Sequence, residues 1–526
     1  MKLALPQKEQ SNPLIRSLMR PGCYDHPVID LRLIETHISW VILTGAYAYK
    51  IKKPVNFGFL DFSTLEKRGL YCQEELRLNS RLAPSIYLEV LAITGNAQHP
   101  KWGKGGEIIE YALKMREFPQ ASQLDRMLMQ GTLTTQHIDA FARRLAEFHQ
   151  SIACADKRTD YGDPDHIQNP VIENFIQIRE RIRDNKLIAI LDRLQQWSVD
   201  RFAKLRPVFM QRKEDDFIRE CHGDLHLRNL AWVDNAPVVF DCIEFNPNLR
   251  WIDVISDIAF LVMDLQDRNQ PRFAQRLLNR YLEVTGDYAG LRLLPFYLCY
   301  RALVRAKVDV IRLQQASMNE GEAEQARREL LGYLRLAERY TQSERPMLII
   351  THGPSASGKS TATQSVLERI GAIRIRSDVE RKRLFGANRG TPENLGIGTG
   401  IYSTEATHKT YEKLVELASC VIDAGVTVIV DAVSMKWEER QAFQTLAVHK
   451  QVPYIILEFV ASVETLRQRI VKREKGVSDA DLAVLEMQLA HWTPLRESEL
   501  SHAVEVNTDL PCDIDGLVRS IHAQSR

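Results

Sequence analysis

Apolar and polar positions alternate in two neighbouring stretches near the start of the chain. Residues 37–45 and 47–52 are rich in β-prone side chains and meet around a glycine, so they predict a β-hairpin. Helical spacing follows over residues 65–82 and stops near a proline. A further strand is predicted over residues 110–115. Strands therefore precede helices in this part of the chain.

The middle of the chain is mainly helical in its pattern. Apolar positions recur at helical spacing over residues 134–213, with a polar, turn-rich interruption at 156–170, and again over 251–340. A short β-rich island is predicted between these helical regions, at residues 217–245. We therefore expect strands at the start, a helical middle and one small β island within it.

The pattern changes after a polar break at residues 341–346. Strands and helices then alternate to the end of the sequence, which is typical of a parallel α/β domain. The predicted strands lie near residues 347–352, 372–376, 426–431 and 454–460. The sequence thus predicts two domains, one over residues 1–342 and one over residues 343–526.

Composition and charge narrow the class of protein. The chain has 526 residues, 44% of them hydrophobic and 26% charged, which is the mix of a soluble globular protein with more than one domain. The formal charge is +1, so no overall field favours nucleic acid or an anionic membrane as a partner. No apolar run approaches the ~20 residues of a membrane span, and the first residues lack the apolar region of a secretory signal.

Eight cysteines are scattered along the chain without a CxxC pair. This spacing does not indicate a disulfide framework, so we expect a protein of the reducing cytoplasm. Cys221 and Cys242 stand in the β-rich island. We interpret them as small buried side chains and not as reactive thiols.

The sharpest motif is GPSASGKS at residues 353–360, between a predicted apolar strand and a predicted helix. It satisfies the pattern GxxxxGK followed by Ser or Thr, in which glycines let backbone N–H groups surround phosphate oxygens at a helix N-terminus. Lys359 would supply charge to the β- and γ-phosphates, and Ser360 a hydroxyl to Mg²⁺. The residues expected to bind nucleotide here are Gly353, Pro354, Ser355, Ala356, Ser357, Gly358, Lys359, Ser360 and Thr361.

Acidic residues follow two of the predicted strands. Asp431 ends one strand and is placed to hold Mg²⁺ or its water, with a solvated strand end as the alternative. Asp378 comes just after another strand, where it would accept a proton from an attacking hydroxyl while Arg381 steadies the acceptor. The alternative for this segment is structural, since Ser377 and Glu380 would form a capping box at a helix start.

Basic residues gather on a predicted helix near residue 470. Arg469 and Arg473 are four residues apart and share one face of that helix. They are candidates to close over the nucleotide and to neutralise charge in phosphoryl transfer. An exposed basic helix is the alternative.

These motifs make residues 347–520 similar to the small P-loop kinases of the polynucleotide kinase, gluconate kinase and zeta-toxin type. The resemblance implies an α/β P-loop NTPase domain with a parallel sheet that uses ATP and Mg²⁺. It puts Asp378 and Arg381 in the places of the polynucleotide kinase base and substrate arginine. It does not carry over an acceptor, and the nearly neutral chain gives no electrostatic footprint for nucleic acid.

A second constellation lies in the β-rich island. Residues 222–229 read HGDLHLRN. Phosphoryl transfer needs a carboxylate at the acceptor hydroxyl and oxygen ligands for Mg²⁺, and the protein-kinase catalytic loop separates its Asp and Asn by four residues. Asp224 and Asn229 keep that interval. Asp241 stands where the metal-binding Asp would follow, with Glu244 as a further candidate. A polar hairpin is the alternative.

This second pattern resembles the aminoglycoside phosphotransferase branch of the protein-kinase fold, over about residues 35–310. The resemblance implies an α+β domain of two lobes, in which Ala48 lines adenine and Lys50 pairs with phosphates. Lys52 has the same strand parity and is the alternative to Lys50. Either Glu74 or Glu75 on the following helix would hold the lysine.

The same resemblance assigns further residues. Asp257 would brace the catalytic loop, and Met115, Arg116 and Phe118 would meet adenine at a hinge between the lobes. His222 is interpreted as a structural hydrogen-bonding residue. The glycine-rich loop of protein kinases is absent, with Gly45 as the glycine near the turn.

The sequence therefore predicts two ATP- and Mg²⁺-dependent phosphotransferase domains in one chain. Their acceptors would be hydroxyl compounds, such as sugars, small alcohols or, for the second domain, a nucleic-acid 5′ hydroxyl. A regulatory protein whose first domain binds ATP without transferring phosphate is the alternative. No membrane partner is expected.

Overall fold

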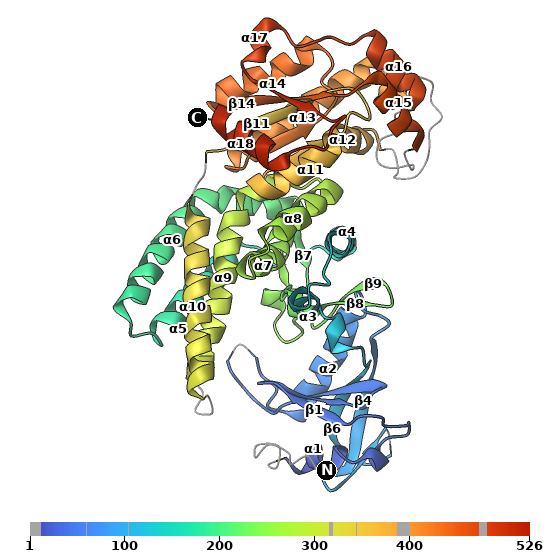
Figure 1. Ribbon diagram of the computed structural model, residues 1–526. Coiled ribbons are helices and arrows are strands. Elements are labelled where there is room, and N and C mark those ends of the chain that lie inside the picture. The colour runs from blue at the N-terminus through green and yellow to red at the C-terminus, as the bar shows by residue number, and fades with distance from the viewer. Residues whose placement is uncertain are drawn as a thin grey trace. The chain divides into compact units, whose positions relative to one another are not determined.

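The computed structural model (Figure 1) describes residues 12–58, 60–103, 105–314, 319–342, 345–386, 400–472 and 481–525. The chain divides into two compact units. Unit 1 comprises Met1–Ala140, Ser151–Ile167 and Phe209–Leu261. Unit 2 comprises Phe141–Gln150, Gln168–Val208 and Val262–Arg526.

Unit 1 is built around a six-stranded antiparallel sheet. In spatial order its strands are β1 (Arg32–Glu35), β2 (Ser39–Leu43), β3 (Tyr47–Lys52), β6 (Ile108–Arg116), β4 (Tyr87–Asn96) and β5 (His99–Trp102). Helix α1 (Pro13–Leu18) packs on the face of the sheet that carries Tyr49 and Ile51. Side chains alternate along a strand, so Lys50 and Lys52 lie on the opposite face. Helix α2 (Leu65–Asn79) packs against β4 and β6.

Two small β structures complete unit 1. Strands β8 (Leu230–Val233) and β9 (Ala236–Val239) form a hairpin. Strands β7 (Ile218–Glu220) and β10 (Trp251–Asp253) pair antiparallel. The 3-10 turn η3 (Leu227–Asn229) precedes β8, so the loop predicted to be catalytic lies between β7 and the hairpin.

Helices fill the middle of the chain, as the apolar spacing predicted. They are α3 (Leu124–Met129), α4 (Thr135–Ser151), α5 (Pro164–Arg179), α6 (Asn185–Glu214), α7 (Val254–Asp267), α8 (Pro271–Thr285), α9 (Leu294–Leu313) and α10 (Glu320–Thr341). The expected turn-rich interruption at 156–170 is shorter than predicted, because α5 already begins at Pro164. Proline fits the first turn of a helix, where its missing N–H has no partner to lose.

The second half of the chain forms a five-stranded parallel sheet. In spatial order its strands are β12 (Ile373–Arg376), β13 (Val428–Asp431), β11 (Leu348–His352), β14 (Tyr454–Val460) and β15 (Ala503–Asn507). The helices of this region are α11 (Lys359–Ile370), α12 (Ser377–Leu384), α13 (Thr404–Asp423), α14 (Trp437–Lys450), α15 (Val463–Lys472), α16 (Leu482–Ala490), α17 (Glu497–Leu500) and α18 (Ile514–Gln524). Ile349, Ile429 and Ile455 of the central strands form a core with Val366 of α11 and Ile521 of α18.

The fold class predicted from the sequence is confirmed for both halves. The early hairpin is β2–β3, and the four predicted parallel strands are β11, β12, β13 and β14; the fifth strand, β15, was not predicted. The capping-box alternative at the start of α12 is wrong, since the N-cap is Arg376 and no side chain of the described residues caps this helix. Within the described ranges, none of the helices is long and apolar enough to cross a membrane.

Candidate active sites

Two lysines of β3 share one buried glutamate of α2. Lys50 Nζ donates to Glu75 Oε1 at 2.7 Å and to Asp241 Oδ1 at 2.6 Å. Lys52 Nζ donates to Glu75 Oε2 at 2.6 Å and also bonds Glu244. The structure thus brings together the strand lysine, a helix glutamate and the predicted metal-binding aspartate.

The two alternatives left open by the sequence have different surroundings. Glu75 is fully buried, whereas Glu74 pairs with Arg77 and Arg250, so Glu75 is the partner of both lysines. Burial alone would raise the pKa of Glu75, yet the ammonium groups of Lys50 and Lys52 hold it well below its ordinary range. The carboxylate is therefore ionised, as an ion-pair partner must be.

The loop at residues 222–229 brings Asp224 and Asn229 together. The Asn229 side-chain amide donates to the main-chain carbonyl of Asp224 at 2.9 Å and to its Oδ2 at 3.1 Å. Nε2 of His226 lies 3.4 Å from the same carboxylate oxygen. The Asp224 carboxylate remains partly exposed, so an acceptor can approach it.

His222 holds this loop by its ring nitrogens. Nε2 lies 2.8 Å from the carbonyl of Phe240, which can only accept, so Nε2 is the protonated nitrogen. Nδ1 accepts the N–H of Asp224 at 3.2 Å. Burial lowers the pKa of His222, so the ring is neutral. These contacts agree with the structural interpretation of His222.

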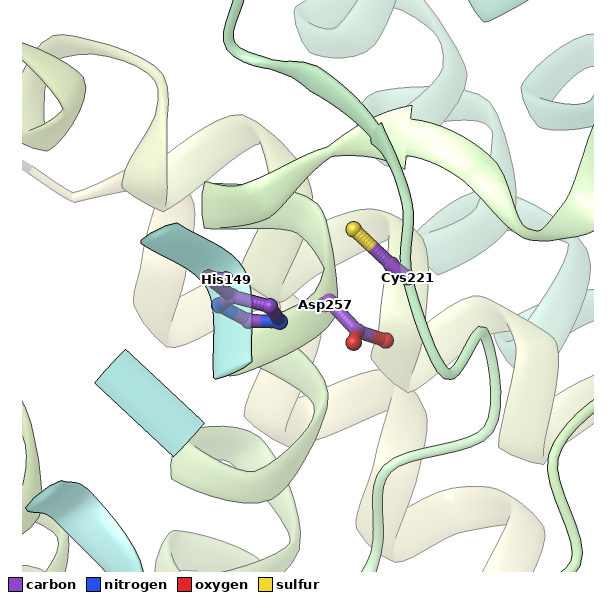
Figure 2. Close-up of side chains that lie close together, drawn as sticks. All are labelled: His149, Cys221 and Asp257. Atoms are coloured by element: carbon purple, nitrogen blue, oxygen red, sulfur yellow. The ribbon is translucent and has the colours of Figure 1, made fainter. Parts of the chain in front are cut away.

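Asp257 of α7 binds the backbone of the loop. Its two carboxylate oxygens accept the N–H groups of His222 at 3.0 Å and Gly223 at 2.8 Å. Figure 2 shows the Asp257 side chain directed from its helix toward the segment that carries Cys221. Gly223 has φ +87°, and a Cβ there would lie 2.6 Å from the carbonyl oxygen of Leu249, so the loop requires glycine. Asp257 is therefore placed as the brace that the resemblance implied.

Two cysteines next to this loop are packing residues. Cys221 and Cys242 are buried, and burial raises the pKa of each thiol above its ordinary value. Neither forms a thiolate near neutral pH, in agreement with the interpretation from sequence. All eight cysteines are free.

The β8–β9 hairpin carries Asn229 and Asp241 to one end. Asn229 precedes β8 and Phe240 follows β9, and the N–H of Phe240 donates to the carbonyl of Asn229 at 3.0 Å. Asp241 has φ +62°, and its N–H donates to Oη of Tyr87 at 3.1 Å. Side-chain oxygens of Asn229 and Asp241 are the hard donors that Mg²⁺ prefers, so these residues fit a magnesium site.

Ala48 and Met115 of the predicted hinge lie in the same sheet. Ala48 is buried and pairs with Met115 across β3 and β6. Phe118 packs edge-to-face on Phe240, with ring centroids 5.4 Å apart. The turn between β1 and β2, at residues 36–38, contains no glycine.

The predicted phosphate loop connects β11 to α11. Gly358 is the N-cap of α11 with φ +85°, and Ala356 also has a positive φ of +64°. Such residues turn successive N–H groups inward, the arrangement that binds phosphate. Lys359 Nζ donates to the carbonyls of Gly353 at 2.8 Å and Pro354 at 2.7 Å, so the lysine folds back over the loop.

Ser360 and Asp431 meet at the start of α11. Ser360 Oγ donates to Asp431 Oδ2 at 2.7 Å. Asp431 ends β13 and is buried, so the solvated strand end considered from the sequence is not what the structure shows. A serine hydroxyl and a carboxylate are oxygen donors and fit Mg²⁺.

Arg469 of α15 lies against the phosphate loop. Its guanidinium donates to the carbonyl of Ala356 at 3.3 Å, to Thr508 Oγ1 at 3.0 Å and to the Thr508 carbonyl at 2.6 Å. The alternative of an exposed basic helix therefore fails for Arg469. Arg473 lies outside the described residues.

Asp378 and Arg381 occupy different positions relative to this site. Asp378 is the second residue of α12, two positions after Arg376, which pairs with Asp431 in the register of β12 and β13. Arg381 is buried and donates to the carbonyl of Ile401 at 2.8 Å and to Thr407 Oγ1 at 3.2 Å. Asp378 thus follows the carboxyl end of β12, while Arg381 is bound to the segment that begins α13.

Some residues of the site were not found from the sequence. Gln488 of α16 accepts the N–H of Ser355 at 2.8 Å, and Thr508 donates to the carbonyl of Ser357 at 3.0 Å. These partners are separated by 133 and 151 residues along the chain, and no local pattern marks them.

Comparison with known proteins places both halves among described families. Residues 71–294 match the phosphotransferase enzyme family, and residues 348–495 match the AAA domain family. Uncharacterized proteins of Mycobacterium tuberculosis and Mycobacterium bovis are each 32% identical over 475 residues, which is 89% of this chain and 91% of each relative.

Solved structures resemble one half or the other. A putative aminoglycoside phosphotransferase from Ralstonia eutropha is 14% identical and covers 60% of this chain and 93% of its own, with a TM-score of 0.37. A gluconokinase from Sinorhizobium meliloti is 18% identical and covers 35% of this chain and 99% of its own, with a TM-score of 0.25.

Proposed function

The chain belongs to the same family as the mycobacterial relatives and carries two kinase-type phosphotransferase domains. We propose that each domain transfers the γ-phosphate of ATP to a hydroxyl acceptor. The first domain would span residues 1–342 and the second residues 343–526. The proposal rests on two pairs of contacts: Lys50 with Asp241 and Asn229 with Asp224 in the first domain, and Lys359 with the carbonyl of Pro354 and Ser360 with Asp431 in the second.

In the first domain the loop carboxylate would serve the acceptor. Asp224 accepts the proton of the attacking hydroxyl or orients that hydroxyl, and Asn229 and Asp241 hold Mg²⁺. Lys50, held by Glu75, pairs with the phosphates, and Ala48 lines adenine. Bound Mg²⁺ supplies charge neutralisation on the transferring phosphate.

In the second domain the phosphate loop would bind the triphosphate. Its backbone N–H groups and Lys359 contact the β- and γ-phosphates, and Ser360 with Asp431 holds Mg²⁺. Arg469, with Arg473, neutralises charge on the nucleotide. Asp378 would act on the acceptor hydroxyl, with Arg381 steadying the acceptor from the neighbouring turn.

We propose hydroxyl compounds as the acceptors. Sugars and small alcohols suit both domains, and a nucleic-acid 5′ hydroxyl is a further candidate for the second. With eight free cysteines, we assign the protein to the reducing cytoplasm.

The test is a phosphorylation screen of a metabolite pool with labelled ATP and the full-length chain. Asp224→Asn is expected to remove the products of the first domain, with a loss of roughly 10²–10⁴-fold, while ATP binding remains. Lys359→Ala is expected to remove the products of the second domain. Asp234→Asn, at the exposed tip of the β8–β9 hairpin, is the matched control. Product patterns unchanged by Asp224→Asn or by Lys359→Ala would remove that domain from the proposal.

A regulatory role for the first domain is a second candidate. The observation that favours it is the turn at residues 36–38, which lacks the glycines that cover ATP phosphates in protein kinases. In that case the first domain binds ATP, and Asp224→Asn changes no product.

A further inference from the structure

Helix α8 contacts the edge strand of the parallel sheet. Helix and strand both belong to unit 2, and β12 is at the edge of the sheet. The Asn279 side chain accepts the N–H of Arg374 at 2.8 Å and donates to the carbonyl of Ala372 at 3.0 Å. Gln275, one turn earlier on α8, donates to the same carbonyl at 2.7 Å. These bonds occupy backbone groups that a further strand would otherwise use, so α8 is fixed in register with β12.

The last turn of α8 holds an arginine of that strand. Arg376 Nη1 donates to Glu283 Oε1 at 3.0 Å, and Arg280 lies 3.2 Å from the same oxygen. The side chains of Glu283 and Arg376 are 7% and 12% exposed. Burial alone would raise the pKa of Glu283, yet the guanidinium groups of Arg376 and Arg280 hold it below its ordinary range. Glu283 is therefore a charged partner in a mostly buried pair.

Arg376 has a second acidic neighbour, in the phosphate site. Its Nε lies 3.7 Å from Asp431 Oδ2, the oxygen that accepts the Ser360 hydroxyl. This closeness follows from the register in which Arg376 pairs with Asp431 across β12 and β13. At 3.7 Å the two charges attract without forming a hydrogen bond. Glu283 and Asp431 therefore compete for one guanidinium group.

We propose that Glu283 is a positioning residue of the P-loop site, which holds Arg376 back from Asp431 so that this carboxylate stays available to Ser360 and Mg²⁺. The inference rests on the function proposed for the second domain. Without the Glu283 charge, the buried guanidinium keeps Asp431 and Asp378 as acidic neighbours. It closes on Asp431, 3.7 Å away, because a buried cation needs a charged partner. An arginine bonded to Asp431 competes with a divalent cation for the same oxygen.

Metal binding by the full-length chain tests the proposal. Mn²⁺ replaces Mg²⁺ as the probe, with a non-hydrolysable ATP analogue, and bound ion is measured by electron paramagnetic resonance. All proteins in this assay carry Asp241→Asn, which removes a proposed metal ligand of the first domain. Mn²⁺ binding at the P-loop site is then defined as the binding that Lys359→Ala removes. Glu283→Gln is expected to weaken Mn²⁺ binding at that site roughly 10-fold, the usual effect of changing a residue behind a metal ligand. Adding Arg376→Gln to Glu283→Gln is expected to restore most of the affinity.

Two control variants separate positioning from loss of structure. Arg276→Gln removes a 2.9 Å ion pair between α8 and Glu368 of α11 and is expected to leave Mn²⁺ affinity unchanged. Glu283→Asp keeps the charge and is expected to bind Mn²⁺ nearly as the parent does. Thermal unfolding of each variant shows that it is folded under the assay conditions.

The outcomes distinguish this inference from the function it rests on. Unchanged Mn²⁺ affinity in Glu283→Gln, or the same loss after Arg376→Gln is added, overturns the role of Glu283. If Lys359→Ala removes no nucleotide-dependent Mn²⁺ binding, the proposed function of the second domain fails instead.

Discussion

At the scale of single residues, Lys50 and Lys52 have the same strand parity but different surroundings. Both bond Glu75, yet Lys50 is 12% exposed and reaches Asp241, whereas Lys52 is 1% exposed and bonds Glu244. The ammonium of Lys52 also lies over the ring of Phe62, 4.7 Å from its centroid. We therefore propose that Lys50 binds the nucleotide and that Lys52 has a structural role.

Substitution of each lysine by methionine is expected to separate these roles. Lys52→Met leaves Glu244 buried without its cation, so we expect a loss of about 3–5 kcal/mol in the free energy of unfolding. Lys50→Met leaves Glu75 paired with Lys52, so stability falls less and ATP affinity falls at the first site. Denaturant unfolding measures the first effect, and calorimetric titration of an ATP analogue in a Lys359→Ala background measures the second. A folded Lys52→Met protein with lost ATP affinity, beside a Lys50→Met protein that binds normally, would reverse the assignment.

At the scale of elements, the end of β11 carries a buried histidine beside the phosphate loop. His352 Nδ1 lies 3.0 Å from the carbonyl of Ser434, so this nitrogen carries the proton. The ring stacks on Trp492, with centroids 4.4 Å apart. Burial, with the nearby charge of Arg440, lowers the pKa of His352 to about 4. The end of this strand is therefore built around a neutral imidazole.

This neutral ring predicts a pH dependence of stability. At pH values between the ordinary histidine pKa near 6.5 and the folded value of about 4, His352 binds a proton in the unfolded chain but not in the folded chain. Stability is therefore full well above pH 6.5 and is lost as the pH falls, by about 1.6 kcal/mol between pH 6.5 and 5. His352→Asn keeps a donor for Ser434 and removes the titration, so its stability is expected to fall less over that range.

Urea unfolding followed by tryptophan fluorescence at several pH values measures this difference. His408→Asn is the matched control, because His408 is 76% exposed on α13, and it is expected to show the pH slope of the parent. An equal pH slope in the parent and in His352→Asn would contradict the buried neutral ring.

Elements that depend on residues adjacent in the chain were predictable from the sequence. The β2–β3 hairpin, the strand β11 and the phosphate loop each follow from residues that are adjacent in the chain. Strand β15 escaped prediction because only one of its five residues is buried, while two are half-buried and two are exposed, so they lack the apolar run of the central strands. Helix α12 begins at Ser377 without a side-chain cap among the described residues, so the capping-box alternative fails there.

The same division holds for the sites. Asp224 and Asn229 are five residues apart, so their contact was predictable from the sequence. Lys359 and Ser360 are adjacent in the phosphate-loop motif, so their shared place was predictable too. The choice between Glu74 and Glu75 was not, because it depends on how α2 is rotated against the sheet. Contacts such as Glu283 with Arg376 join distant segments, and single-sequence spacing carries no signal for them.

At the scale of the whole molecule, the compact units do not follow the predicted cut at residue 343. Residues 262–342 cluster with the P-loop region in unit 2, and the segment from α8 to Tyr288 supplies partners to β12, α11 and α12. Among these contacts, Tyr288 Oη donates to Glu380 of α12 at 3.2 Å, and Arg276 pairs with Glu368 of α11 at 2.9 Å. The cut at residue 343 remains a prediction about sequence domains.

These contacts predict that the chain stays together when it is cut between the two sequence domains. Cleavage at a protease site inserted between residues 342 and 345 would break the covalent link between α8 and β12 and leave their hydrogen bonds in place. Each such bond contributes about 1 kcal/mol, and the ion pairs of Arg276 with Glu368 and of Arg376 with Glu283 add to them. We therefore expect the two pieces to elute together in size-exclusion chromatography after complete cleavage. Asn279→Ala combined with Glu283→Gln removes the bonds to Arg374 and Arg376 and is expected to release the second piece. Separate elution of the cleaved parent would show that α8 contributes little to holding the P-loop region.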